Sequence, residues 1–156
     1  MTHRTRYTDL IREIANHRRL PFDLLEAMVI QESGGDTNAL RYEQHFYERY
    51  IVGNPTAKAA QYGPFAACSC GLMQILVEVA YEIGYTGRPE GLFVPRVGLL
   101  YGATKFRALV DRYGSDDAGL QRALGAYNGG HGAVASGPPY KTHAYIDQVW
   151  ARAGRI

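Results

Sequence analysis

The sequence predicts a mainly α-helical fold in a single domain over residues 1–156. Apolar residues recur at i, i+3, i+4 and i+7 along most of the chain, and glycine or proline separates the segments with this period. No convincing strand pattern and no internal repeat are visible. The hydrophobic fraction of 46% and the charged fraction of 21% are ordinary for a globular protein of this length.

The predicted helices begin and end at ordinary helix signals. A first amphipathic helix covers residues 5–18, and Pro21 with Asp23 begins a second, which runs to Glu32 and is apolar on nearly all sides. A third covers residues 39–51 and is followed by a loop over residues 53–71. Four more are expected over residues 72–83, 95–114, 118–127 and 142–153. The pattern therefore predicts about six to seven helices.

Composition excludes several classes of function. A net charge of +2 is too small to predict a nucleic-acid-binding face, and no glycine-rich phosphate loop is present. Cys68 and Cys70 are too close in sequence for an unstrained disulfide, and they lack partners at zinc spacing. We therefore expect two free thiols, no metal and no cofactor.

The N-terminal 19 residues carry charges throughout and lack the apolar stretch of a signal peptide. No apolar run approaches the roughly 20 residues that a membrane span requires. We expect synthesis in the cytoplasm without a signal peptide, and no membrane insertion.

Glu32 is the first candidate catalytic residue. It ends the apolar second helix within Glu32-Ser33-Gly34, where desolvation and the partial negative charge of a helix C-terminus both favour the protonated carboxyl. A general acid needs that form, and one such acid is the minimum for cleaving a glycosidic bond. The structural alternative is a carboxylate that only caps a neighbour or pairs with an arginine. Ser33 is expected either to orient the acid or merely to end the helix.

Three motifs in order resemble those of lytic transglycosylases with the goose-type lysozyme-like fold. They are Glu32-Ser33-Gly34, Gly71-Leu72-Met73-Gln74-Ile75 and Ala126-Tyr127-Asn128-Gly129-Gly130, and Thr142 with Tyr145-Ile146 fits a fourth element. The resemblance covers residues 20–149. It implies a mainly α, lysozyme-like domain whose partner is the glycan strand of peptidoglycan.

The resemblance also implies residue roles. Glu32 would be the single acid/base, protonating the oxygen between N-acetylmuramic acid and N-acetylglucosamine. The C6 hydroxyl of the muramic acid would then attack its own C1, giving a 1,6-anhydro sugar without consuming water. Gln74 would contact substrate, Tyr127 and Asn128 would line sugar subsites, and the hydroxyl of Tyr145 would approach the catalytic carboxylate. An Asn-Gly-Gly helix end and a buried tyrosine are the structural alternatives for the last three.

The spacing between the first two motifs departs from the family pattern. The 36 residues at positions 35–70 make a longer segment than in common soluble transglycosylases. Residues 40–47 are similar to the Phe-Glu-x-His-x-Phe element of some phage-type N-acetylmuramidases, so Glu43 is a candidate second carboxylate. It would hold a water opposite Glu32 for inverting hydrolysis. The alternative is a solvated helix in which Arg41 and Glu43 form surface pairs.

These observations favour a monomeric enzyme that cleaves peptidoglycan without hydrolysis. Two alternatives stay open: a hydrolytic muramidase that uses Glu32 with Glu43, and a non-catalytic wall-binding module that keeps the fold. The small size and the missing leader favour a bacteriophage endolysin or virion-associated lysin that is delivered to the cell wall.

Overall fold

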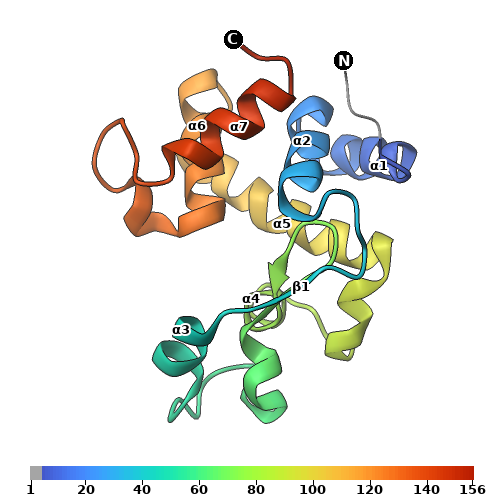
Figure 1. The fold of residues 1–156 in the computed structure, drawn as a ribbon, viewed down its shortest axis with the longest axis vertical. Coiled ribbons are helices and arrows are strands. Elements are labelled where there is room, and N and C mark those ends of the chain that lie inside the picture. The colour runs from blue at the N-terminus through green and yellow to red at the C-terminus, as the bar shows by residue number, and fades with distance from the viewer. Residues whose placement is uncertain (1–4) are drawn as a thin grey trace. The chain divides into compact units, whose positions relative to one another are not determined.

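Two helices, α2 (Phe22–Ser33) and α5 (Pro95–Tyr113), connect the two units into which the chain packs. Unit 2 comprises Glu32–Gly102, and unit 1 comprises the chain on either side of it. The computed structural model describes residues 5–156. Figure 1 shows the course of the chain. Helices predominate, as the sequence predicts.

Unit 1 is helical. It contains α1 (Thr8–Arg18), most of α2 and α5, α6 (Asp117–Gly129), the 3-10 helix η4 (His131–Val134) and α7 (His143–Arg152). The five helices predicted for these segments are confirmed to within a few residues. Asp116 begins α6 by accepting the backbone N–H of Gly119 at 2.9 Å, as an N-cap residue should. Helices α6 and α7 lie side by side (Figure 1).

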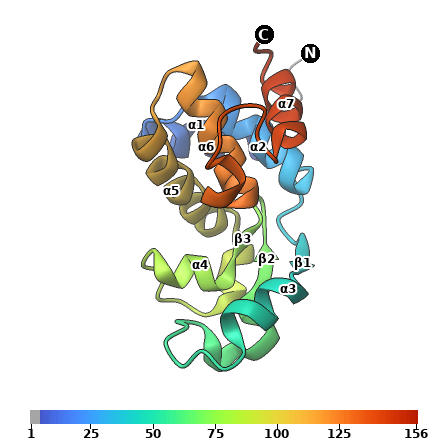
Figure 2. The same cartoon turned by 90° about the vertical axis from the view of Figure 1, so that its left-hand side faces the viewer.

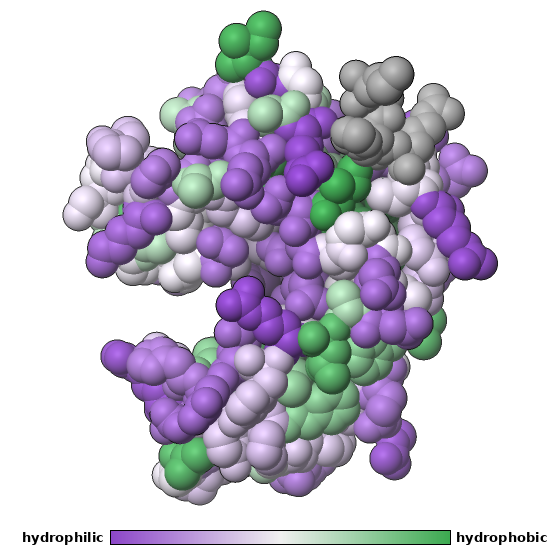
Figure 3. All heavy atoms as spheres, viewed as in Figure 1, coloured by the Kyte–Doolittle hydropathy of each residue, from purple (hydrophilic) through white to green (hydrophobic). Residues whose placement is uncertain are grey.

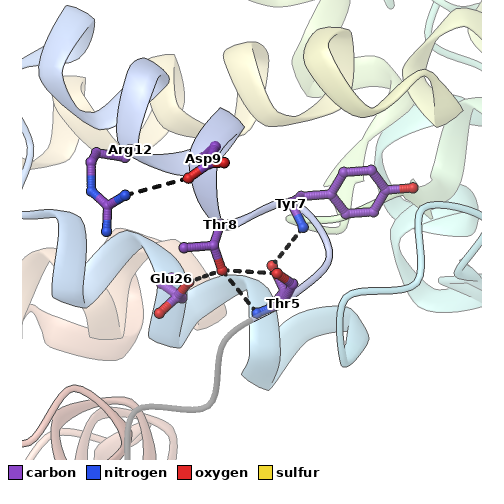
Figure 4. Close-up of polar contacts among 6 residues, drawn as sticks. All are labelled: Thr5, Tyr7, Thr8, Asp9, Arg12 and Glu26. Carbon is purple, nitrogen blue, oxygen red and sulfur yellow. Dashed lines mark hydrogen bonds and ion pairs between the residues drawn. The ribbon is translucent and has the colours of Figure 1, made fainter.

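A buried carboxyl group joins α1 to α2. Glu26 is only 6% exposed, and its Oε2 accepts a hydrogen bond of 2.7 Å from the hydroxyl of Thr8. The same hydroxyl oxygen accepts the backbone N–H of Thr5 at 3.0 Å (Figure 4). A buried carboxyl group needs such a partner, and this contact links the two helices. The hydrophobic periodicity of α2 gave no indication of it.

Unit 2 contains a small antiparallel sheet, so the expectation of no strand is wrong. Strands β1 (Leu40–Tyr42), β2 (Cys68–Cys70) and β3 (Ile75–Leu76) lie in that order. Arg41 is opposite Ser69, and Ser69 is opposite Leu76. Figure 2 shows α4 (Val77–Glu82) beside β2 and β3. Both cysteines of β2 are buried and free, and burial raises the pKa of Cys70 to about 12.

The helix predicted over residues 39–51 is also wrong. After β1 the chain forms a single turn, α3 (Gln44–Phe46), which continues into the π-helix η1 (Tyr47–Ile51). Pairing of β1 with a strand distant in sequence overrides the local helical period. The predicted loop over residues 53–71 contains the 3-10 helix η2 (Ala60–Ala67) as well as β2.

The helix predicted over residues 72–83 begins only at Val77. The residues before it form a turn and β3, because Gly71 and Gln74 both have positive φ angles, 75° and 50°. A further 3-10 helix, η3 (Pro89–Phe93), precedes α5. On the face shown in Figure 3, the surface over α3 is mainly hydrophilic, with a small hydrophobic area beside it. Within residues 5–156, no helix has the length and apolar character needed to cross a membrane.

Candidate active site

Glu32 is the penultimate residue of α2 and is half-buried. Its position at the C-terminal end of the helix is the one predicted. The last turn of α2 carries no basic residue. The partial negative charge of the helix C-terminus is therefore not offset by a basic residue of that turn.

Ser33 connects Glu32 to the second motif within unit 2. Its hydroxyl donates to the carbonyl oxygen of Leu72 at 2.8 Å, and its Oγ accepts the backbone N–H of Gly35 at 3.2 Å. The hydroxyl thus orders the backbone that leaves the helix. The hydroxyl therefore helps to end the helix, and its predicted role in orienting Glu32 stays a prediction.

The second motif forms a tight turn that is fastened to the start of β1. The backbone N–H of Gly71 donates to the carbonyl oxygen of Ala39 at 2.9 Å, and Nε2 of Gln74 donates to the same oxygen at 3.0 Å. Nε2 also donates to the carbonyl oxygen of Gly71 at 3.1 Å. The amide nitrogen of Gln74 therefore holds the turn together. Its predicted contact with substrate stays a prediction.

No side chain fits at Gly71. A Cβ there would lie 2.8 Å from the carbonyl oxygen of Leu92, and the φ of 75° is in the left-handed region. Backbone from η3 therefore passes directly against this turn. The close approach of another chain segment therefore requires glycine at this position.

Glu43 follows β1 in the same unit as Glu32. Its backbone N–H donates to the carbonyl oxygen of Ala67 at 2.9 Å, and its Oε1 lies 3.3 Å from Nε of Arg41. The Glu43 side chain is 34% exposed and that of Arg41 is 76% exposed. An ion pair so accessible to solvent contributes little stability. The surface pair expected as the structural alternative is present, and Glu43 as a second carboxylate stays a prediction.

In unit 1, the third motif ends α6. Tyr127 is buried, and its ring packs edge-on against Phe106 with centroids 6.2 Å apart. Nζ of Lys105 lies 4.2 Å from the centroid of the Tyr127 ring and donates to the carbonyl oxygen of Tyr127 at 3.2 Å. Asn128 is exposed. Tyr127 thus has a packing role, and Asn128 is the more accessible of the two for a sugar.

Lys105 is a residue that sequence reasoning missed. Its signal in the sequence is weak, because it is one of four basic residues in α5. A cation over an aromatic ring and on the last carbonyls of a helix is favourable in both places.

The fourth element packs against the third. The hydroxyl of Thr142 donates to the carbonyl oxygen of Gly125 at 3.0 Å. A Cβ at Gly125 would lie 2.8 Å from Oγ1 of Thr142 and 2.9 Å from Cδ1 of Ile146. Tyr145 follows on α7 and is buried.

The structure therefore joins the predicted motifs in pairs. In unit 2, Ser33 is hydrogen-bonded to Leu72 and Gln74 to Gly71, whereas Tyr127, Thr142 and Tyr145 belong to unit 1. The approach of the Tyr145 hydroxyl to Glu32 stays a prediction. Within residues 5–156, no cluster of three or more histidine, cysteine, aspartate or glutamate side chains is placed to hold a metal ion.

Residues 9–146 match the family model described as the transglycosylase SLT domain. The fold is similar to that of an inactive mutant of the lytic transglycosylase Slt from Pseudomonas aeruginosa, with a TM-score of 0.67 and 21% identity over 95% of this chain. It is also similar to that of the 70 kDa soluble lytic transglycosylase from Escherichia coli, with a TM-score of 0.65 and 19% identity over 94% of this chain. The chain spans 23% of the length of each of these two proteins. A comparison with curated proteins gives no match.

Proposed function

Because this chain belongs to the transglycosylase SLT domain family, we propose that it cleaves the glycan strands of peptidoglycan with Glu32 as the acid/base. The observation that carries the proposal is the position of Glu32. It is half-buried at the end of a helix, and the next residue is hydrogen-bonded to the second motif at 2.8 Å. The similar Pseudomonas aeruginosa enzyme is inactive when glutamine replaces one of its glutamates, which supports a glutamate-dependent reaction.

The proposed reaction breaks the bond between C1 of N-acetylmuramic acid and the bridging oxygen. Glu32 gives its proton to that oxygen, which leaves as the 4-hydroxyl of N-acetylglucosamine. The ionised Glu32 then accepts the proton of the C6 hydroxyl while the C6 oxygen of the muramic acid forms a bond to C1. The product is a 1,6-anhydro end, and the acid regains its proton. The nucleophile is part of the substrate, so no second carboxylate is needed to activate water.

The hydrolytic alternative rests on Glu43. It lies in the same unit as Glu32 and its side chain is accessible to water. In that reaction Glu43 would activate a water molecule, and the new end would be a reducing sugar.

Product masses distinguish the two reactions. Purified cell walls are digested with the wild-type protein and with Glu43→Gln, and the released fragments are weighed by mass spectrometry. We expect ends lighter by one water than reducing ends from both proteins. Reducing ends from the wild type, together with loss of activity in Glu43→Gln, would establish the hydrolytic reaction instead.

The Glu32→Gln variant tests catalysis itself. We expect clearing of wall suspensions to fall by about 10²–10⁴-fold while the circular dichroism spectrum is unchanged. Glu48→Gln, an exposed carboxyl in the same unit, is the matched control and should clear walls normally. Clearing that survives in Glu32→Gln would contradict the assignment and favour a wall-binding module.

The remaining expectations are part of the same proposal. We propose that residues 1–156 act as one monomeric catalytic domain on the cell wall, which light scattering after size-exclusion chromatography tests directly. The bacteriophage origin and the delivery route stay predictions from the sequence.

A further inference from the structure

Unit 2 contains a cavity of about 330 Å³ that none of the predicted site residues lines. Its walls come from the segment between the first two motifs and from α4. A cavity of this size is at the lower end of the range for small-molecule sites, roughly 300–1,000 Å³. Its lining combines an apolar wall with charges of both signs: Phe46, Tyr50, Val79, Lys58, Glu78 and Glu82.

The loop on one side of the cavity is held in place by its own polar groups. Asn54 accepts the backbone N–H and the hydroxyl of Thr56 at 3.1 and 2.7 Å, and its Nδ2 donates to the carbonyl oxygen of Tyr50 at 2.9 Å. The buried carboxylate of Glu78 accepts the backbone N–H groups of Lys58 and Ala59 at 3.1 and 2.7 Å. These bonds fix the backbone of Lys58 against α4, so the cavity is formed before any ligand arrives.

The two acidic groups at the cavity differ in how far they are accessible to a ligand. The buried Glu78 carboxylate accepts two backbone N–H groups, whereas Glu82, one helical turn later, is exposed and its carboxyl group is hydrogen-bonded to Glu78. Lys58 brings the single positive charge of the lining, and its side chain is exposed. The rings of Phe46 and Tyr50 pack together with centroids 4.9 Å apart and offer an aromatic wall beside these charges.

We propose that this cavity binds a free amino-acid group, in which one carbon carries both an ammonium and a carboxylate. Glu82 accepts the ammonium, Lys58 binds the carboxylate, and the aromatic wall contacts the attached carbon chain and the cation. A simple amine would be repelled by Lys58, and a simple carboxylate by the acid pair. A group that carries both signs complements both kinds of charge in the lining.

This step rests on the proposed function. The source of the amino-acid group is then the unlinked end of a diamino acid in the peptides of the cell wall. The cavity then serves to recognise peptide while Glu32 acts on glycan. A free amino acid has the same chemistry, so the experiment must separate the two sources.

Proton linkage gives the site a distinctive signature. Partial burial of the carboxyl and its hydrogen bond to Glu78 raise the pKa of Glu82 to about 7, against a smaller opposing effect of Lys58. Binding of an ammonium favours the ionised carboxylate. Affinity is therefore expected to rise by up to about tenfold per pH unit below pH 7 and to level off above it.

The test uses three probes with similar carbon chains on the full chain, followed by NMR. meso-Diaminopimelic acid carries amino-acid ends, cadaverine carries only ammonium groups, and pimelic acid carries only carboxylates. We expect shifts at Tyr50, Val79 and Glu82 with the first probe, and binding at least about tenfold weaker with the other two. Equal binding of all three, or shifts that map elsewhere, would overturn the proposal.

Two variants test whether Glu82 and Lys58 bind the charged groups of the ligand. Glu82→Gln and Lys58→Met should each weaken binding of diaminopimelic acid by about tenfold or more, and Glu82→Gln should also abolish the pH dependence. Glu90→Gln is the matched control, because this glutamate is exposed, pairs with Arg88 and does not line the cavity. Unchanged affinity in either cavity variant would contradict the site.

A wall peptide that contains diaminopimelic acid separates the sources. Binding at least as tight as that of the free amino acid supports recognition of wall peptide, and failure to bind the peptide excludes it. Cleavage of peptide-free glycan strands is measured in parallel. Loss of cleavage in Glu32→Gln with intact binding tests the proposed function separately, so the two proposals fail independently.

Discussion

The hydroxyl of Ser33 donates to the carbonyl oxygen of Leu72 at 2.8 Å. The residue next to the proposed acid is thereby bonded to Leu72 of the second motif, 39 positions further along the chain. A hydrogen bond of this kind contributes about 1 kcal/mol to stability. Its larger consequence is positional, because small displacements of an acid reduce its efficiency.

Replacing Ser33 separates these two effects. Ser33→Ala should lower the free energy of unfolding by about 1 kcal/mol and lower kcat about tenfold at an unchanged KM, because binding groups are untouched. Urea unfolding and wall-clearing kinetics measure both. Ser33→Thr keeps a hydroxyl and should restore most of the loss. If kcat is unchanged in Ser33→Ala, the hydroxyl only ends the helix.

Gly71 tests how tightly the second motif packs. In Gly71→Ala the new Cβ would lie 2.8 Å from the Leu92 carbonyl oxygen at a φ of 75°, so we expect a loss of about 2–3 kcal/mol in urea unfolding. Gly53 has a similar φ of 69° but open space around it, so Gly53→Ala should lose about 1 kcal/mol. Equal losses would show that backbone conformation alone requires glycine at position 71.

Gly125 lies inside α6, where alanine is intrinsically the better residue by about 1 kcal/mol. We nevertheless expect Gly125→Ala to destabilise the protein by about 1–3 kcal/mol, because its Cβ would lie 2.8 Å from Oγ1 of Thr142. Thermal unfolding measures the change. The double variant with Thr142→Ser removes a methyl group but not the clash, so it should not recover stability. If Gly125→Ala were more stable than the wild type, α7 would be able to move away from the new Cβ at little energetic cost.

The contact between Thr8 and Glu26 should be measurable in unfolding. Thr8→Val keeps the shape of the side chain but removes the hydrogen bond to a buried carboxyl group, so we expect a loss of about 1.5–3 kcal/mol. Thr86→Val, at an exposed threonine, should change stability by less than about 0.5 kcal/mol. Similar effects in the two variants would contradict a structural role for Glu26.

Glu82 should make stability depend on pH. Its pKa is about 7 in the folded protein against 4.5 as the ordinary value. The folded state therefore holds this proton more tightly, and the resulting stabilisation is complete below pH 4.5 and is lost as the pH rises through 7. Glu82→Gln cannot ionise, so it should be more stable than the wild type at pH 8, by on the order of 1 kcal/mol given the solvent exposure.

Unfolding by urea at pH 4, 6 and 8 checks this difference. We expect the advantage of Glu82→Gln to shrink as the pH falls and to vanish at pH 4. An advantage independent of pH would point to packing rather than to the proton. One that grows on acidification would contradict the sign of the pKa shift.

The sequence predicts helices well where each helix buries its own apolar stripe. Helices α1, α2, α5, α6 and α7 all begin and end within a few residues of the predicted positions, and the family is predicted correctly. The hydrophobic period of each of these helices can be read from residues that are close together in the sequence. The position of Glu32 at the end of α2 follows from the same pattern, which is why this candidate residue was accessible to sequence reasoning.

The sheet of unit 2 could not be predicted from a local hydrophobic period. Leu40, Arg41 and Tyr42 become a strand only because Cys70, Ser69 and Cys68 pair with them, and these partners are about 28 residues distant. The predicted helix over residues 39–51 had a reasonable local pattern and the wrong tertiary context. The cavity around Lys58 and Glu82 was missed for the same reason, since its walls come from two segments that are distant in sequence.

The bonds made by Gln74 limit how this residue can meet a ligand. Both hydrogens of its amide nitrogen point at backbone carbonyl oxygens of Ala39 and Gly71. Only the oxygen Oε1 has bonding capacity to spare, so the predicted contact of Gln74 with substrate would be made to a hydroxyl or N–H group and not to a carbonyl. Glutamate at this position would keep an acceptor oxygen but lose the N–H donors that hold the turn, so the amide nitrogen is the part of the side chain that the turn requires.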